Sequence, residues 1–249
     1  MMALMISIIA LVGIILERIL TTSIDEEIRV HNGQCINMLQ YQILYLFKNA
    51  DNLCKNSLLI GSFLDQNRRL DYLPQLIGSF LTKNIHAISV LDSDNSVIYS
   101  TMEHPPDYSR VRYLKIAMGI NQPRFYVSDN NNLVYIVPIY LETSQGSLVI
   151  EYDLAGIFDT ITTRKDIFYR LYADNIKITE KKFDVHNSYV TTKDYATRED
   201  FILSKLNISV ELGMPRSHYK EVVLAAILKL VLVGIVFIIA TIFNSHQDG

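Results

Sequence analysis

The sequence predicts an α+β protein in which a long N-terminal helix and a five-stranded antiparallel sheet are followed by a smaller β-rich module. Three patterns predict this fold: a proline-free heptad repeat over residues 21–64, short β-branched runs between 85 and 154, and further such runs between 166 and 214. Apolar segments at 1–20 and 222–243 enclose these elements, so the predicted fold class includes two flanking transmembrane helices.

The two terminal segments support a two-pass arrangement. Residues 222–243 are apolar except for Lys229, and a helix of this length crosses a bilayer while its lysine reaches the nearer interface. Residues 1–20 lack the basic start and small-residue cleavage site of a signal peptide, so an uncleaved anchor is favoured over a cleaved signal. Too few lysines and arginines flank the spans to set the orientation. We expect an inner-membrane protein with an extracytoplasmic central domain and a cytoplasmic stub at 244–249.

Residues 21–82 are predicted to form a long helix continuous with the first span and a shorter helix over Tyr72–Leu81. Apolar residues recur at spacings of three and four along the long helix. This heptad seam either packs against the helix's own domain or pairs with a second copy in a parallel dimer, and both alternatives stay open. A second apolar row through Tyr41, Leu44 and Phe47 would allow both. The residues expected in a homodimer are Ile36, Leu39, Ile43, Leu46 and Leu53.

Residues 83–160 change from helical to strand periodicity and form the predicted core of the distal domain. Ile85–Asp92 and Val97–Thr101 flank turn residues and predict a hairpin. Three further strands are predicted over Phe125–Ser128, Leu133–Leu141 and Ser147–Leu154. Helices over one face of such a five-stranded sheet would leave a cavity between sheet and helices.

Residues 161–220 are predicted to form a smaller membrane-proximal module rich in β-strands. Its strands are separated by charged turns and are predicted over Ile167–Tyr172, Ile176–Thr179, Tyr189–Thr192 and Ile208–Leu212.

Composition and motifs exclude several classes of function. The net charge of −3, without a dominant basic patch, argues against nucleic-acid binding. The histidines have no metal-type spacing, and the sequence has neither a phosphate-binding glycine loop nor a GxSxG elbow, so no enzyme, metal or cofactor is predicted. Cys35 and Cys54 lie roughly 28 Å apart along one predicted helix and cannot bridge within it. Buried free thiols are favoured over a disulfide across a dimer.

Four motifs occur in a characteristic order: VLDSDNSVIYST at 90–101, DYSRVRY at 107–113, RFYVSD at 124–129 and VYIVPIYLETSQGSLVIEYDL at 134–154. In this order they resemble the Cache family of extracytoplasmic sensor domains. The family's hairpin, its D-x-S-x-R-x-Y-F segment, its proline-containing strand and its G-x-L-x-x-x-x-D-L ending are the matching features. The resemblance covers about residues 85–157 and implies that the five-stranded sheet is PAS-like.

The resemblance also implies a small-molecule site. The family's arginine, which commonly holds a ligand carboxylate, falls at Val111 here, and Arg110 and Arg112 flank it. Asp153 closes the last strand, where amino-acid-binding members hold a ligand amine. The expected ligand-binding residues are Tyr99, Arg110, Arg112, Tyr113, Arg124, Tyr126, Tyr135 and Asp153.

A second, fainter resemblance is to the periplasmic sensor of bacterial cyclic-di-GMP phosphodiesterases that bear a Cys-Ser-Ser motif. Cys54 matches that family's helical cysteine, but residues 99–101 carry no second cysteine. This resemblance therefore ranks below the first.

The predicted function is ligand sensing by a membrane-anchored receptor of histidine kinase, diguanylate cyclase/phosphodiesterase or chemoreceptor type, whose output domain is outside this chain. An amino acid, a carboxylate or an amine is the expected ligand, and membrane lipid and a second copy are the expected partners. The alternative is a ligand-free dimerisation or scaffold module whose cavity is filled by side chains.

Overall fold

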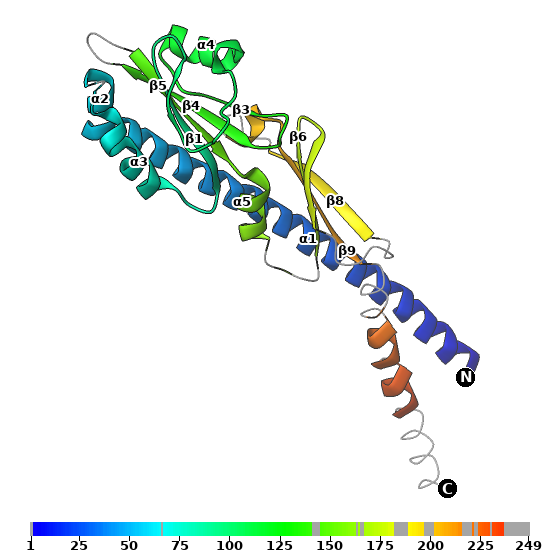
Figure 1. The fold of residues 1–249 in the computed structure, drawn as a ribbon. Helices are drawn as coiled ribbons and strands as arrows, with labels where there is room; N and C mark the ends of the chain where they lie inside the picture. The colour runs from blue at the N-terminus through cyan, green and yellow to red at the C-terminus, as the bar shows by residue number, and fades with distance from the viewer. Residues whose placement is uncertain are drawn as a thin grey trace, which may run out of the picture.

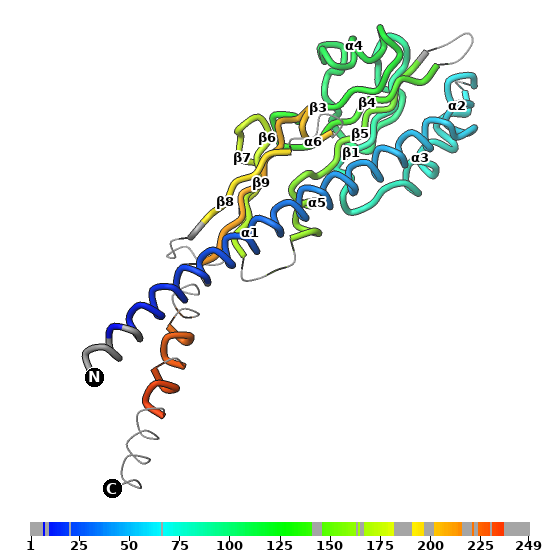
Figure 2. Tube along the Cα trace, turned by 180° about the vertical axis from the view of Figure 1, so that it is seen from behind, coloured from blue at the N-terminus to red at the C-terminus, as the bar shows by residue number. Residues whose placement is uncertain are grey.

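One helix extends along the whole molecule and carries two sheets. In a computed structural model of the chain, α1 (Met2–Cys54) is an unbroken helix of 53 residues, and both sheets lie along it (Figure 1). The N-terminal end of α1 and the helical residues near the C-terminus lie at the same end of the molecule (Figure 2). The structure describes residues 2–65, 67–140, 145–162, 164, 167–181, 189–196, 202–215, 221, 224–229 and 231–236.

The sheet farther from the N-terminal end of α1, here the distal sheet, has the five antiparallel strands predicted. Its order is β2-β1-β5-β4-β3, and every neighbouring pair is antiparallel. The strands are β1 (Ile85–Leu91), β2 (Val97–Ser100), β3 (Arg124–Val127), β4 (Leu133–Tyr140) and β5 (Gln145–Tyr152). The prediction of a PAS-like antiparallel sheet is confirmed.

Helices cover both faces of the distal sheet, whereas the sequence predicted helices over one face. On one face lie α1, α2 (Ser57–Leu64) and α3 (Arg69–Phe80), and on the other lie η1 (Tyr108–Arg110) and α4 (Arg112–Ile120). The reason is that β4 is buried at consecutive positions from Leu133 to Val137, so both of its faces need apolar cover.

The long helix is shorter than predicted, because α1 ends at Cys54 instead of continuing to residue 64. The Asn56 side chain accepts a hydrogen bond of 2.9 Å from the backbone N–H of Leu58 and caps a new helix, α2. Residues 57–64, predicted as part of the long helix, therefore belong to α2.

The heptad seam packs against the protein's own domain. The five residues predicted to form a homodimer are 0–7% exposed and share one core with the strands. They are Ile36, Leu39, Ile43, Leu46 and Leu53. The prediction that these residues form a homodimer interface is wrong, because the sheets already cover this side of α1. In the second row Phe47 joins the core, whereas Tyr41 is 72% exposed.

The proximal sheet has four antiparallel strands in the order β7-β6-β9-β8 and agrees with the second β-rich module predicted. Its strands are β6 (Phe168–Ala173), β7 (Ile176–Lys181), β8 (Tyr189–Tyr195) and β9 (Ser209–Pro215), with α6 (Ile202–Lys205) before the last. Asn32 of α1 donates its Nδ2 to the carbonyls of Thr192 and Val210, and Gln40 accepts from the Leu203 N–H. The Asn32 bonds join α1 to the proximal sheet and the Gln40 bond joins it to α6, so these buried polar groups find partners.

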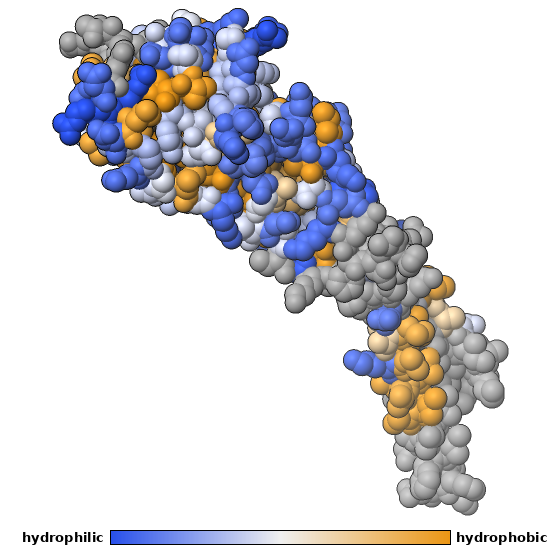
Figure 3. All heavy atoms as spheres, viewed as in Figure 1, coloured by the Kyte–Doolittle hydropathy of each residue, from blue (hydrophilic) through white to orange (hydrophobic). Residues whose placement is uncertain are grey.

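Within the described part of the chain, no helix combines the length and the apolar character that crossing a membrane requires. The spans predicted at 1–20 and 222–243 lie partly outside that part and stay predictions. Figure 3 shows apolar residues gathered at the end of the molecule that carries residues 224–236. Exposed side chains there include those of Leu224, Leu228, Leu232 and Val233.

We expect Leu39→Ala to lower the free energy of unfolding by about 2–5 kcal/mol, because it leaves a cavity where α1 meets the core. Tyr41→Ala, on the opposite side of the same helix, should change it by less than about 0.5 kcal/mol. Chemical denaturation followed by circular dichroism measures both. Equal losses for the two variants would show that the buried side of α1 is assigned wrongly.

Candidate ligand-binding site

The segment DYSRVRY forms η1 and the first turn of α4, on the side of the distal sheet away from α1. Asp107 caps η1: its Oδ1 accepts from the Ser109 N–H at 3.1 Å and from the Ser109 hydroxyl at 2.6 Å. These hydrogen bonds lower the pKa of Asp107. The next residue, Tyr108, is buried against the sheet. The segment of η1 and α4, which lies between β2 and β3 in the chain, therefore forms an ordered cover over this face of the distal sheet.

Side chains fill the space beneath this cover. The Ser89 hydroxyl lies 3.0 Å from the Tyr108 hydroxyl and 2.9 Å from the Ser100 hydroxyl, so these buried groups satisfy one another. Burial raises the pKa of Tyr108. The apolar residues packed around this chain of hydroxyls are Leu91, Leu114, Ala117, Val134, Ile136 and Val149.

A buried carboxylate that the sequence analysis missed lies on the same face. Glu151 is 9% exposed, and its Oε2 accepts a hydrogen bond of 3.3 Å from the Asn132 amide. Burial, followed by the charge of Glu151, raises the pKa of Tyr126 to about 12. The alternation of side chains along β5 could have predicted that Glu151 is buried on this face. Ile150 and Tyr152 face α1, so the residue between them must face α4.

Three of the predicted ligand-binding residues meet in one cavity of about 370 Å³. The rings of Tyr113 and Tyr126 stack with centroids 4.5 Å apart and planes 9° apart, and Arg124 lies beside them. The Nε of Arg124 is buried and has no hydrogen-bond partner in the described part of the chain. Asp174 and Lys205 of the proximal module close the cavity. The cavity thus lies where the two modules meet.

Three other predicted residues lie outside this cavity. Arg110 is exposed and forms an ion pair of 3.2 Å with Asp107, and Arg112 is exposed at the start of α4. Tyr99 packs against the core that contains α1.

The last two predicted residues have structural partners. Tyr135 faces α1, stacks on Phe47 with centroids 3.7 Å apart and donates a hydrogen bond of 3.0 Å to Asp51. Asp153 follows β5, and its Oδ1 caps α5 (Leu154–Ile161) by accepting from the Gly156 N–H at 2.9 Å. The predicted strand over 147–154 therefore ends at Tyr152.

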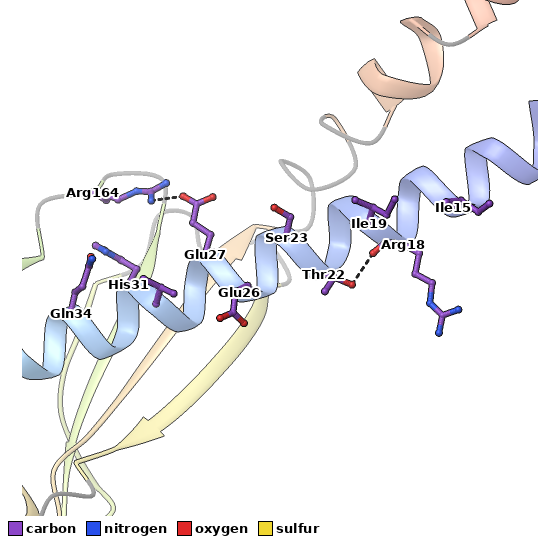
Figure 4. Close-up of a pocket in the computed structure, with 11 residues that line it drawn as sticks. Ile15, Arg18, Ile19, Thr22, Ser23, Glu26, Glu27, His31, Gln34 and Arg164 are labelled. Atoms are coloured by element: carbon purple, nitrogen blue, oxygen red, sulfur yellow. Dashed lines mark hydrogen bonds and ion pairs between the residues drawn. The ribbon is translucent and has the colours of Figure 1, made fainter.

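A larger hollow of about 1190 Å³ lies along the N-terminal half of α1, with Arg164 at its edge (Figure 4). Arg164 forms an exposed ion pair of 2.8 Å with Glu27. Figure 4 shows Arg18 and Glu26 directed away from Glu27 and Arg164, so only some of the polar groups that line this hollow face one another. A small ligand needs converging groups, and we place the candidate site at the smaller cavity.

Comparison with known proteins finds no matching family model and no matching curated sequence. Solved structures do match. A domain from Vibrio parahaemolyticus described as part of a sensory box/GGDEF family protein has a TM-score of 0.60 at 13% identity, covering 81% of this chain and 99% of its own. The sensor domain of the V. cholerae histidine kinase DctB has a TM-score of 0.54 at 12% identity, covering 78% and 98%. The chain has the fold of these sensor domains.

A third match is the ligand-binding domain of the Campylobacter jejuni chemoreceptor Tlp3, solved in complex with L-valine. Its TM-score is 0.50 at 9% identity, and it covers 80% of this chain and 97% of its own. At these identities the comparisons establish the fold, which agrees with the Cache-like architecture expected from the motifs.

We expect Tyr126→Phe to remove one tyrosine that ionises near pH 12 from the alkaline absorbance titration. The variant keeps the ring that stacks on Tyr113, so the change isolates the Tyr126 hydroxyl. Because the folded protein holds the Tyr126 proton more tightly than the unfolded chain, its contribution to stability is present below about pH 10 and is lost as the pH rises toward 12. A titration unchanged by Tyr126→Phe would contradict this environment.

Proposed function

We propose that the chain is the sensing part of a membrane receptor, whose extracytoplasmic domain binds a small polar molecule and passes a displacement along α1. One observation carries the proposal: α1 packs against both sheets as a single unbroken helix. Any change in how the modules pack on α1 therefore acts on a rigid rod that leads to its N-terminal end. The shared fold with sensor domains of a histidine kinase and a GGDEF family protein supports the same role.

The proposal includes attachment of the protein to the membrane at the N-terminal end of α1. Leu11, Ile14, Ile15 and Ile19 of α1 are exposed, as are apolar side chains between residues 224 and 236. Both groups lie at the same end of the molecule (Figures 1 and 2). Exposed apolar surface of this extent supports contact with lipid, in a two-pass inner-membrane arrangement.

The cavity between the modules favours an anionic ligand group. Arg124 and Lys205 supply two positive charges against the single carboxylate of Asp174. A ligand carboxylate would give the buried Nε of Arg124 the hydrogen bond that it lacks among the described residues, while Tyr113 and Tyr126 form an apolar wall. Because residues of both modules line the cavity, a bound ligand would favour one packing of the modules over another.

The scaffold alternative also has an observation in its favour. The space between η1 and the distal sheet is filled by Tyr108 and its neighbours. In addition, the side of α1 away from the sheets exposes Val30, Met38, Tyr41 and Tyr45, which a second copy could cover. A dimer without a ligand would use this side of α1.

We expect amino acids or simple carboxylates to raise the thermal unfolding temperature of wild-type protein, since a ligand that binds only the folded state adds about 2.7 kcal/mol at 100 times its dissociation constant. Arg124→Gln should abolish the increase. Arg110→Gln, an exposed arginine outside the cavity, should retain it. Thermal-shift measurements across a ligand panel test this expectation.

Two outcomes would count against sensing at this cavity. A full panel without any stabilising compound, together with a dimer that Tyr41→Glu dissociates, would support the scaffold. Stabilisation that survives in Arg124→Gln would place the ligand elsewhere.

A further inference from the structure

A second cavity, of about 430 Å³, lies on the opposite face of the distal sheet, at the C-terminal end of α1. Its walls come from α1, α2, β4 and the residue before β3, so four segments meet around it. The apolar residues of these walls are Ile60, Pro123, Val137, Pro138 and Ile139, and the polar groups are Asp51, Cys54, Lys55 and Tyr140.

Asp51 is a half-buried carboxylate held in a fixed position. The hydroxyl of Tyr135, which is only 4% exposed, donates a hydrogen bond of 3.0 Å to Asp51 Oδ1. Stacking on Phe47 fixes the ring of Tyr135 in turn. Among the residues that the structure describes, no cation forms an ion pair with Asp51, and the neighbouring Lys55 is exposed. Lys55 also lines the cavity, but it forms no ion pair with Asp51, so the carboxylate lies at the cavity without a directly paired cation among the described residues.

The end of α1 adds a second source of negative potential. The last turn of this helix contains no basic residue, although the exposed Lys55 follows it directly, and its final carbonyls carry the negative end of the helix dipole. An aspartate in this turn is unfavourably placed unless a cation compensates it. Burial, and then the charge of Asp51, raise the pKa of Cys54, so the thiol stays protonated and adds no charge.

We propose that this cavity binds a small primary ammonium ion that carries a short hydrocarbon chain. The ammonium group pairs with Asp51 and the C-terminal carbonyls of α1, and the hydrocarbon lies against Ile60, Val137 and Ile139. Binding here stabilises the junction of α1, α2 and β4. The proposal does not depend on the cavity between the modules, because the two cavities lie on opposite faces of the sheet and favour opposite charges.

The test uses n-butylammonium chloride with the full chain in detergent and measures the thermal unfolding temperature. Sodium butyrate and 1-butanol have the same hydrocarbon chain without the positive charge, and sodium chloride controls for ionic strength. Asp51→Asn keeps an acceptor for Tyr135 but removes the charge. Ile60→Phe reduces the cavity without changing any charge, and Asp71→Asn removes an exposed carboxylate of α3 as a matched control.

We expect n-butylammonium to raise the unfolding temperature of wild-type protein and of Asp71→Asn in a saturable manner. The increase should be lost in both Asp51→Asn and Ile60→Phe, and 1-butanol and butyrate should not reproduce it. No saturable increase in wild-type protein, or the same increase in Asp51→Asn, would overturn the proposal. Arg124→Gln should leave the response to butylammonium intact, which separates this site from the one between the modules.

Discussion

The burial of one side of α1 against two sheets is the constraint on which the rest of the structure depends. Residues from Ile28 to Leu53 on this side join a core that includes strands of both modules. Between them, Asn32 and Gln40 satisfy backbone groups of the proximal module at points where an apolar residue would leave buried donors and acceptors unpaired. The helix therefore stabilises each module and also fixes how they lie relative to each other.

This arrangement gives the two cavities different consequences. The cavity lined by Tyr113, Arg124 and Tyr126 lies between the modules, so a ligand there acts on their relative packing. The cavity beside Asp51 lies where α1 ends and α2 begins, so a ligand there acts on the far end of the same helix. Both ligands would alter the rod, but at different points along it.

The sequence predicted the strands well because strand signals are local. Turns at Asn95 and Asn131 adopt left-handed backbone conformations that asparagine tolerates, and alternating apolar residues mark the runs between them. The end of α1 was not predictable in the same way, since neither proline nor glycine interrupts residues 51–57. A capping asparagine is recognisable there only once the helix on each side is known.

The candidate site was harder to predict than the fold. The motif predicted a ligand site at residues 107–113, but the neighbours of this segment in space depend on long-range packing. Tyr126 faces α4 while Tyr135, on the paired strand, faces α1. Asp153, expected to bind a ligand, caps a helix instead, and the carboxylate buried beneath α4 is Glu151.

Native-state hydrogen exchange tests most directly whether α1 makes the two modules one cooperative unit. If it does, amides in the buried part of α1, in β5 and in β9 will open with the same free energy and the same dependence on denaturant. Opening of β9 at a much lower free energy, while β5 and the C-terminal half of α1 stay protected, would contradict this cooperativity. The proximal module would then fold and move independently of the helix proposed to carry the signal.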